Sequence, residues 1–301
     1  SKNVIGIVNI QSGKEQNYAI KSEHLMDIFE NVVDDSEFTT SKVKIKSSLT
    51  IEQRDLIKYK NKNNLKEVLR SYNSVNDIWV EPHWDKFPEK NSSSDEINKL
   101  DLSDIIKEPK SIFIRSGQQY GASSLAYYLI DKAWEAEEPS FWLYLDSNKL
   151  KPHINQIQKD VVRYLKTFGL DLSDVECVIL DEFSNTVPNA NKILENISSL
   201  FENKSLLVMY SHTDNPLLNQ SIIFPREFDE FHLWALNRKG IRKLVNCYNN
   251  ELYIEEENRV ISKVVSDLEA LNIPRTPQNC LTILKISEIE FDDSPVNRTE
   301  M

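Results

Sequence analysis

Between residues 111 and 236, short apolar runs alternate with segments of helical periodicity, and this alternation constrains the fold more than any other feature. The predicted strands are 111–114, 141–145, 176–180, 206–209 and 231–236. The helices predicted between them are 124–136, 154–168 and 190–201. Strands that are apolar at nearly every position are typical of a parallel sheet with helices on both faces. We therefore predict an α/β three-layer sandwich with a parallel sheet.

The pattern changes on both sides of this core, which we assign to residues 111–237. From Arg238 onward only helical patterns are found, at 238–248, 256–271 and 278–286, which predicts a helical lid subdomain over 238–301. Residues 84–110 are polar and are predicted to be a linker. Residues 1–83 are predicted to be a connector or the tail of an upstream domain, with β-like runs at 4–10 and 42–45 and helix within 51–72. We expect the chain to be a piece of a longer polypeptide.

The turn that follows the first core strand matches most of a phosphate-binding loop. Such a loop places free backbone N–H groups and a helix N-terminus around phosphate oxygens, in the pattern G-x-x-x-x-G-K-[ST]. Here Ser116 and Gly121 take the glycine positions, whereas Ala122 replaces the lysine. The predicted nucleotide-binding residues of this P-loop are Ser116, Gly117, Gln118, Gln119, Tyr120, Gly121, Ala122, Ser123 and Ser124. An ordinary strand-to-helix turn with a small N-cap residue is the alternative interpretation.

Two carboxylates, Asp181 and Glu182, end an apolar strand about sixty residues after this loop. In a P-loop ATPase an Asp at this place helps to hold Mg²⁺, and a Glu polarises the attacking water. Asp181 and Ser123 are therefore predicted metal ligands, and Glu182 is a candidate catalytic residue. We expect this strand to lie beside the P-loop strand, so that both strand ends face a common cavity. The alternative is an acidic pair at a solvent-facing strand end.

A third candidate lies after the strand 206–209, which leads into His212. ATPases of this broad group commonly carry a polar or basic sensor residue at that place. His212 is therefore a candidate nucleotide-binding residue, and a solvent-facing loop histidine is the alternative.

Composition restricts the class of function. The formal net charge is −11, from 47 acidic and 36 basic residues, and no Lys/Arg run is present. A nucleic-acid motor of related fold is therefore disfavoured. No apolar run approaches the roughly 18 residues that a membrane span needs. Cys177, Cys247 and Cys280 are odd in number and far apart, which fits a reducing, cytoplasmic location.

The layout resembles the STAND and NACHT-like class of signal-transducing P-loop NTPases, whose helical lid carries a proline near the nucleotide base. More narrowly, the sequences at 78–82, 273–277 and 295–299 resemble bacterial proteins in which such a module follows a calcineurin-like metallophosphoesterase domain. The resemblance covers most of residues 75–301. It implies ATP or ADP with Mg²⁺ as cofactor, Pro274 and Pro277 near the base, and self-association or a partner protein. It also implies an upstream effector domain and a role in antiviral defence. No phosphoesterase motif occurs in this chain.

The replacement of the lysine by Ala122 bears directly on turnover. The lysine of such a loop makes charge-assisted bonds to phosphate of about 1.5–3 kcal/mol each. Losing one or two of them lowers affinity roughly ten- to several hundredfold, and hydrolysis suffers more because the same charge stabilises the transition state. Arg115, just before the loop, is a candidate substitute. Two functions stay open: a regulatory nucleotide-binding switch with slow or no ATPase activity, and a catalytically dead scaffold for oligomerisation or partner binding.

Overall fold

The computed structural model describes residues 4–9, 17–21, 49–69, 78–89, 101–212, 222–252, 254–289, 291–292 and 294–295. The chain divides into two units, Ser1–Val43 and Lys44–Met301. In the first unit, β1 (Val4–Asn9) pairs antiparallel with β2 (Asn17–Lys21). The β-like run predicted at 42–45 lies outside the described residues.

The second unit is built on a six-stranded sheet in the order β3-β8-β4-β7-β6-β5. Its strands are β3 (Trp84–Asp85), β4 (Ile112–Ser116), β5 (Phe141–Asp146), β6 (Val175–Phe183), β7 (Ser205–Ser211) and β8 (Asp229–Leu233). All of the pairings are parallel except that of β3, which lies antiparallel to β8 at one edge. The carboxyl ends of the five parallel strands therefore all lie on the same side of the sheet, where the strands end.

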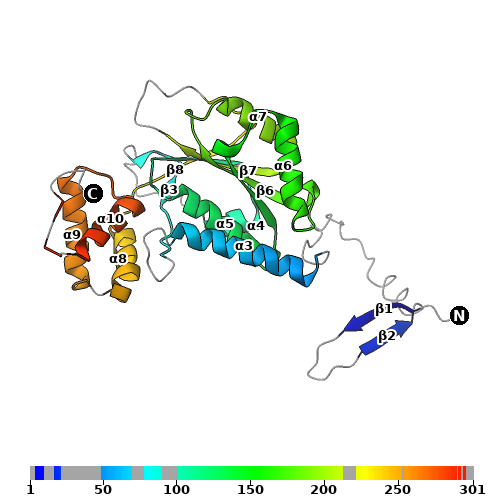
Figure 1. Cartoon of the computed structure of the whole chain (residues 1–301), viewed down its shortest axis with the longest axis horizontal. Coiled ribbons are helices and arrows are strands. Elements are labelled where there is room, and N and C mark those ends of the chain that lie inside the picture. Colours follow the sequence, from blue (N-terminus) through cyan, green and yellow to red (C-terminus); the bar gives the residue numbers. More distant parts are fainter. Residues whose placement is uncertain are drawn as a thin grey trace. The chain divides into compact units, whose positions relative to one another are not determined.

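Helices cover both faces of this sheet (Figure 1). One face carries α4 (Leu102–Lys107) and α5 (Ala122–Glu135), and α3 (Ile51–Leu69) packs along α5. The other face carries α6 (Ile154–Lys166) and α7 (Ala190–Leu200). The predicted α/β three-layer sandwich with a parallel sheet is confirmed.

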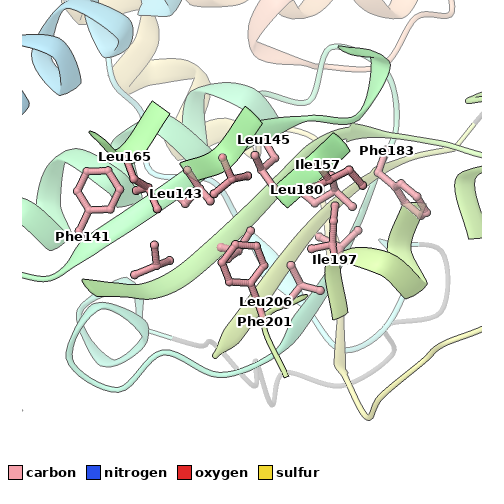
Figure 2. Packing of buried hydrophobic residues seen from close by; sticks show 14 of the residues in the cluster. Phe141, Leu143, Leu145, Ile157, Leu165, Leu180, Phe183, Ile197, Phe201 and Leu206 are labelled. Atoms are coloured by element: carbon pink, nitrogen blue, oxygen red, sulfur yellow. The ribbon is translucent and has the colours of Figure 1, made fainter. Parts of the chain in front are cut away.

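Alternate strand residues enter two separate cores, because successive side chains of a strand point to opposite faces. In β4, Phe113 joins the core under α6 and α7, whereas Ile112 and Ile114 join the core under α5. Figure 2 shows the first of these cores, where Phe141, Leu143 and Leu180 of the sheet meet residues of the two helices. Both faces of the strands are buried, which is why the strands are apolar throughout.

Three further helices form a subdomain with its own core (Figure 1). They are α8 (Arg238–Leu252), α9 (Glu257–Ala270) and α10 (Pro277–Ser287). Helix α10 begins with Pro277 at its first turn, and the Thr276 side chain caps it by accepting a hydrogen bond from Asn279 N–H. The Leu236 N–H donates to the Arg275 carbonyl, so the chain leaving β8 is tied to the turn before α10. The predicted helical subdomain is thus confirmed.

One prediction about the sheet is wrong. The P-loop strand β4 and the acidic strand β6 are not neighbours, because β7 lies between them and pairs with both. The chain leaves β6, returns through α7 and fills the place next to β4. Hydrophobic periodicity identifies a strand but does not give its place in the sheet.

The predicted linker also contains secondary structure. Trp84 and Asp85 form the edge strand β3, and α4 begins after Asp101, whose carboxylate accepts a hydrogen bond from Ser103 N–H. Helix α3 lies within the second unit and packs on α5. The proposed boundaries at 83/84 and 110/111 stay predictions. Among the described residues, no helix is both long enough and apolar enough to cross a bilayer.

Candidate functional site

The turn between β4 and α5 has backbone geometry that two glycines permit. Gly121 is the N-cap of α5 and has a left-handed φ of 86°. Side chains avoid that conformation because the Cβ crowds the backbone. At position 117 glycine is favoured for a steric reason. A Cβ added there would lie 2.5 Å from Cε2 of Tyr120, because the Tyr120 ring packs against Gly117. The geometry of the loop therefore disfavours any residue with a side chain at both positions.

The N-terminus of α5 leaves backbone donors without helical partners. The first helical hydrogen bond runs from Leu125 N–H to the Gly121 carbonyl at 2.9 Å. The N–H groups of Ala122, Ser123 and Ser124 precede it, so they have no acceptor within the helix. The dipole of α5, a helix of 14 residues, adds partial positive charge at the same place. The arrangement suits an anion.

The two acidic residues that end β6 have different surroundings. Asp181 is buried, and its Oδ2 accepts from the Tyr144 hydroxyl at 2.9 Å while its Oδ1 accepts from Glu182 N–H at 2.8 Å. Burial raises the pKa of Asp181, and hydrogen bonds from Ser123, Glu182 N–H and Tyr144 oppose that rise. Glu182 is exposed and has a left-handed φ of 55°. Such a backbone in a non-glycine residue stores strain of order 1–3 kcal/mol.

The P-loop and the acidic pair meet although their strands are not adjacent. Ser123 Oγ donates to Glu182 Oε1 at 3.2 Å, which joins the start of α5 to the end of β6. With β7 between them, the two strands are about 10 Å apart, twice the usual strand spacing. The predicted common cavity at the two strand ends is therefore confirmed.

Strand β5 and the short turn that follows it supply two residues that hold the acidic pair. Tyr144 stacks on Tyr127 of α5 with ring centroids 4.5 Å apart, which orients its hydroxyl toward Asp181. Burial and the charge of Asp181 raise the pKa of Tyr144, so its hydroxyl stays a donor. The Ser147 hydroxyl donates to the Glu182 carbonyl at 2.6 Å. The sequence did not predict a role for these two residues, because Tyr144 lies within an apolar strand and Ser147 belongs to no recognised motif.

The P-loop and the acidic pair line a cavity of about 590 Å³ between the α/β core and the helical subdomain. Its polar part includes the P-loop, Asp181 and Glu182, and also Asn148, Ser184, Thr186, Ser211 and Gln278. Its apolar part comes from the segment before β3, the chain after β8, and α10, and includes Trp79, Pro82, Trp234, Leu236, Pro277 and Leu281. Trp79 is held by Tyr128 of α5, with the rings 3.9 Å apart and 8° from parallel. The segment 78–82 contributes to the resemblance found in the sequence, but its place in the cavity was not predicted.

The predicted site residues divide into those that line the cavity and those that do not. All nine P-loop residues, Asp181, Glu182 and Pro277 line it. Pro274 does not, and its carbonyl instead accepts hydrogen bonds within the turn before α10. The side chain of His212 is exposed and does not line the cavity, although its N–H donates to the Ser116 carbonyl at 3.0 Å.

Arg115 does not replace the missing lysine. Its Nε lies 2.8 Å from Glu230 Oε2 on β8, and its guanidinium stacks over the rings of Phe113 and Tyr210. Those rings belong to the core under α6 and α7, on the face of the sheet opposite α5. The pleat of β4 thus directs Arg115 away from the P-loop.

The oxygen donors fit Mg²⁺ in part. The Ser123 hydroxyl and the carboxylates of Asp181 and Glu182 are the hard ligands that this ion prefers. Both oxygens of Asp181, however, already accept protein hydrogen bonds. No group of three or more His, Cys, Asp or Glu side chains suited to a metal occurs in the described part of the chain. Magnesium here would therefore depend on phosphate oxygens for much of its coordination.

The strand–loop–helix unit, the parallel sheet and the buried aspartate together give the core the fold of a P-loop NTPase domain. No family model matches the sequence, and neither does any curated protein. Among solved structures, the chain is similar to the replication initiator DnaA bound to AMPPCP and single-stranded DNA, at 10% identity over 63% of this chain and 59% of that one, with a TM-score of 0.42.

Two other solved structures have comparable similarity. The RuvB Holliday junction branch migration motor of Thermotoga maritima matches at 14% identity over 64% of this chain and 69% of that one, with a TM-score of 0.35. The Orc1 protein of Aeropyrum pernix in complex with DNA matches at 13% identity over 66% of this chain and 62% of that one, with a TM-score of 0.43. The match spans less than two thirds of the DnaA and Orc1 chains. At these identities and TM-scores the similarity carries no argument about function.

Proposed function

We propose that the cavity binds a nucleotide and that the chain is a regulatory nucleotide-binding switch in which hydrolysis is weak or absent. One observation carries the proposal: the residues at the N-terminus of α5, the Ser123–Glu182 contact and an aromatic wall all line the same cavity. A nucleotide has an anionic end and an aromatic end, and this lining offers a complement to each.

Binding would couple the core to the helical subdomain. The phosphates would lie at the N-terminus of α5, and the base would lie against the wall that includes Trp79 and Trp234. Pro277 lies at the start of α10, and its Cγ is 3.8 Å from the position of a Cβ on Gly121. A ligand that contacts both bodies would favour the arrangement in which they are close, which is the requirement for a ligand-driven switch.

Hydrolysis has less support than binding. Glu182 is the candidate to polarise an attacking water, but its carboxylate accepts a hydrogen bond from Ser123 Oγ at 3.2 Å. Ala122 brings no charge to the transferring phosphate, where a lysine would stabilise the transition state. We therefore expect slow ATPase activity at most.

Isothermal titration with ATP and Mg²⁺ tests the binding site. We expect submillimolar to millimolar affinity for the wild-type chain, and loss of that binding in the double variant Gly121→Asp, Asp181→Ala. The matched control is Glu138→Gln, an exposed position outside the cavity. An affinity that is the same in the double variant and in the control would contradict the assignment of the site.

A catalytically dead scaffold for oligomerisation or partner binding is the second candidate. It is favoured by Ala122 and by the fact that both Asp181 oxygens are already hydrogen-bonded. The same titration separates the two candidates, because the scaffold predicts no heat at millimolar ligand.

By resemblance, we further propose a STAND or NACHT-like module of a bacterial multidomain protein that serves antiviral defence. An upstream metallophosphoesterase domain would be its effector, and self-association or a partner would transmit the switch. The reading frame upstream of Ser1 tests this proposal, and a frame that encodes no phosphoesterase would contradict it.

A further inference from the structure

We infer that this cavity recognises the nucleoside part of its ligand and is nearly insensitive to the number of phosphates attached. The inference rests on the proposed function and specifies its ligand as a nucleoside or a nucleotide of any phosphate number. It follows from the distribution of charge and of aromatic groups over the lining.

No cationic side chain is found among the described residues that line the polar part of the cavity. Among the described residues that line it, the charged ones are Asp181 and Glu182, and none is Lys, Arg or His. Backbone N–H groups at the start of α5 can satisfy one phosphate group. Each additional phosphate adds negative charge near two carboxylates, so it gains little net attraction.

The metal cannot fully restore that attraction. A magnesium ion would have to displace the Tyr144 hydroxyl or share Asp181 with it, because Tyr144 donates to Oδ2 at 2.9 Å and Glu182 N–H donates to Oδ1 at 2.8 Å. Ser123, the other predicted ligand, donates its hydroxyl proton to Glu182, which leaves its oxygen lone pairs available to a metal. The usual advantage of Mg·ATP over the nucleoside is therefore reduced for two reasons: no Lys, Arg or His lies among the described lining residues, and both oxygens of Asp181 already accept hydrogen bonds.

The apolar wall, by contrast, is held in place by contacts within the protein. Trp79 is stacked on Tyr128 at 3.9 Å, and the Trp234 Nε1–H donates to the Phe87 carbonyl at 2.9 Å. Aromatic rings that are already fixed lose little conformational entropy when a base packs on them. This contribution is the same for adenosine, AMP, ADP and ATP.

Such a site would report occupancy rather than hydrolysis state. If the affinities for ATP and ADP are similar, conversion of one to the other leaves the site filled. The switch would then respond to the total concentration of nucleoside-bearing ligand, which is compatible with the loss of the lysine at Ala122.

The test is a ladder of adenosine, AMP, ADP and ATP, each titrated into the wild-type chain with Mg²⁺ at about 150 mM salt. Trp79 and Trp234 line the cavity and provide an intrinsic fluorescence signal. We expect dissociation constants within about tenfold of one another, a spread of about 1.4 kcal/mol. A larger preference for ATP overturns the inference and leaves the proposed function in place. Failure of all four to bind at millimolar concentration overturns the proposed function itself.

Two variants separate the contributions. Ala122→Lys should raise affinity for ATP at least tenfold and change affinity for adenosine less than twofold, whereas Glu138→Gln adds the same charge outside the cavity and should change neither. Trp79→Ala should weaken binding of all four ligands by a common factor, whereas Tyr59→Ala removes an exposed aromatic ring outside the cavity and should have no effect. A loss in Trp79→Ala confined to ATP contradicts the inference. If a variant fails to fold, the four titrations of the wild-type chain still test the inference.

Discussion

Replacing Tyr144 by Phe tests how the buried aspartate is held. The substitution keeps the ring, which stacks on Tyr127 at 4.5 Å, and removes the hydroxyl that donates to Asp181 Oδ2. Asp181 is only 1% exposed, so water cannot easily replace the lost donor. The change therefore removes the hydrogen bond to a desolvated carboxylate together with the hydroxyl's interaction with the Tyr127 hydroxyl, and it leaves the ring in place.

The expected loss of stability follows from that bond. A hydrogen bond to a charged group contributes about 1.5–3 kcal/mol. The partial exposure of Tyr144 places the expectation in the lower part of this range, near 1.5–2 kcal/mol. Since about 1 kcal/mol moves the midpoint of a chain of this size by about 2–4 °C, Tm should fall by several degrees.

The loss should depend on pH in a defined direction. Burial raises the pKa of Asp181 in the folded state, so the unfolding free energy falls as pH rises from the unfolded value through the folded value. Removing a donor that favours the ionised form raises the folded pKa further. The cost of Tyr144→Phe should therefore be full at pH 7 to 8, if Asp181 is ionised there, and smaller at acid pH, where the carboxyl is protonated in both proteins.

Urea unfolding followed by circular dichroism at several pH values measures this cost. The matched control is Tyr164→Phe on α6, because the Tyr164 hydroxyl makes no hydrogen bond within the described part of the structure and the aromatic ring is kept. We expect less than about 0.5 kcal/mol for the control. Equal losses in the two variants, or a Tyr144→Phe loss that does not shrink toward acid pH, would refute the reasoning.

Three further predictions concern the loop, the core and the charge. Gly121→Ala should cost about 1–2 kcal/mol in urea unfolding, because φ is 86° there and the space for a Cβ is adequate, so the cost is backbone strain alone; a neutral result would contradict the loop geometry. Leu129→Ala, at a fully buried position of α5, should cost about 2–5 kcal/mol, and a loss below 1 kcal/mol would show that α5 is not packed as described. The net charge of −11 predicts no retention of double- or single-stranded DNA in filter binding at about 150 mM salt, and salt-dependent retention would contradict it.

Much of the core was predictable because its signals are local. The strands are apolar at nearly every position since both faces are buried, and the helices carry the usual periodicity. The P-loop was predictable despite Ala122, because Gly121 and Ser123 mark the start of α5. The acidic pair was predictable because it ends a buried strand.

Other features depend on information that periodicity does not contain. The order of strands places β7 between β4 and β6, and no local pattern specifies that insertion. Strand β3 has only two residues and forms because β8 offers it an edge. Trp79 and Trp234 reach the cavity from segments far apart in the sequence. Arg115, by contrast, could have been placed from the pleat, since alternation with Ile114 puts it on the other face from α5.

A crystal structure of the chain soaked with ADP and Mg²⁺ tests the central proposal most directly. We predict ligand density in the cavity, with phosphates at the N–H groups of Ala122 to Ser124 and the base against the wall of Trp79 and Trp234. An empty cavity at millimolar ADP, or a ligand bound elsewhere on the chain, would contradict the account.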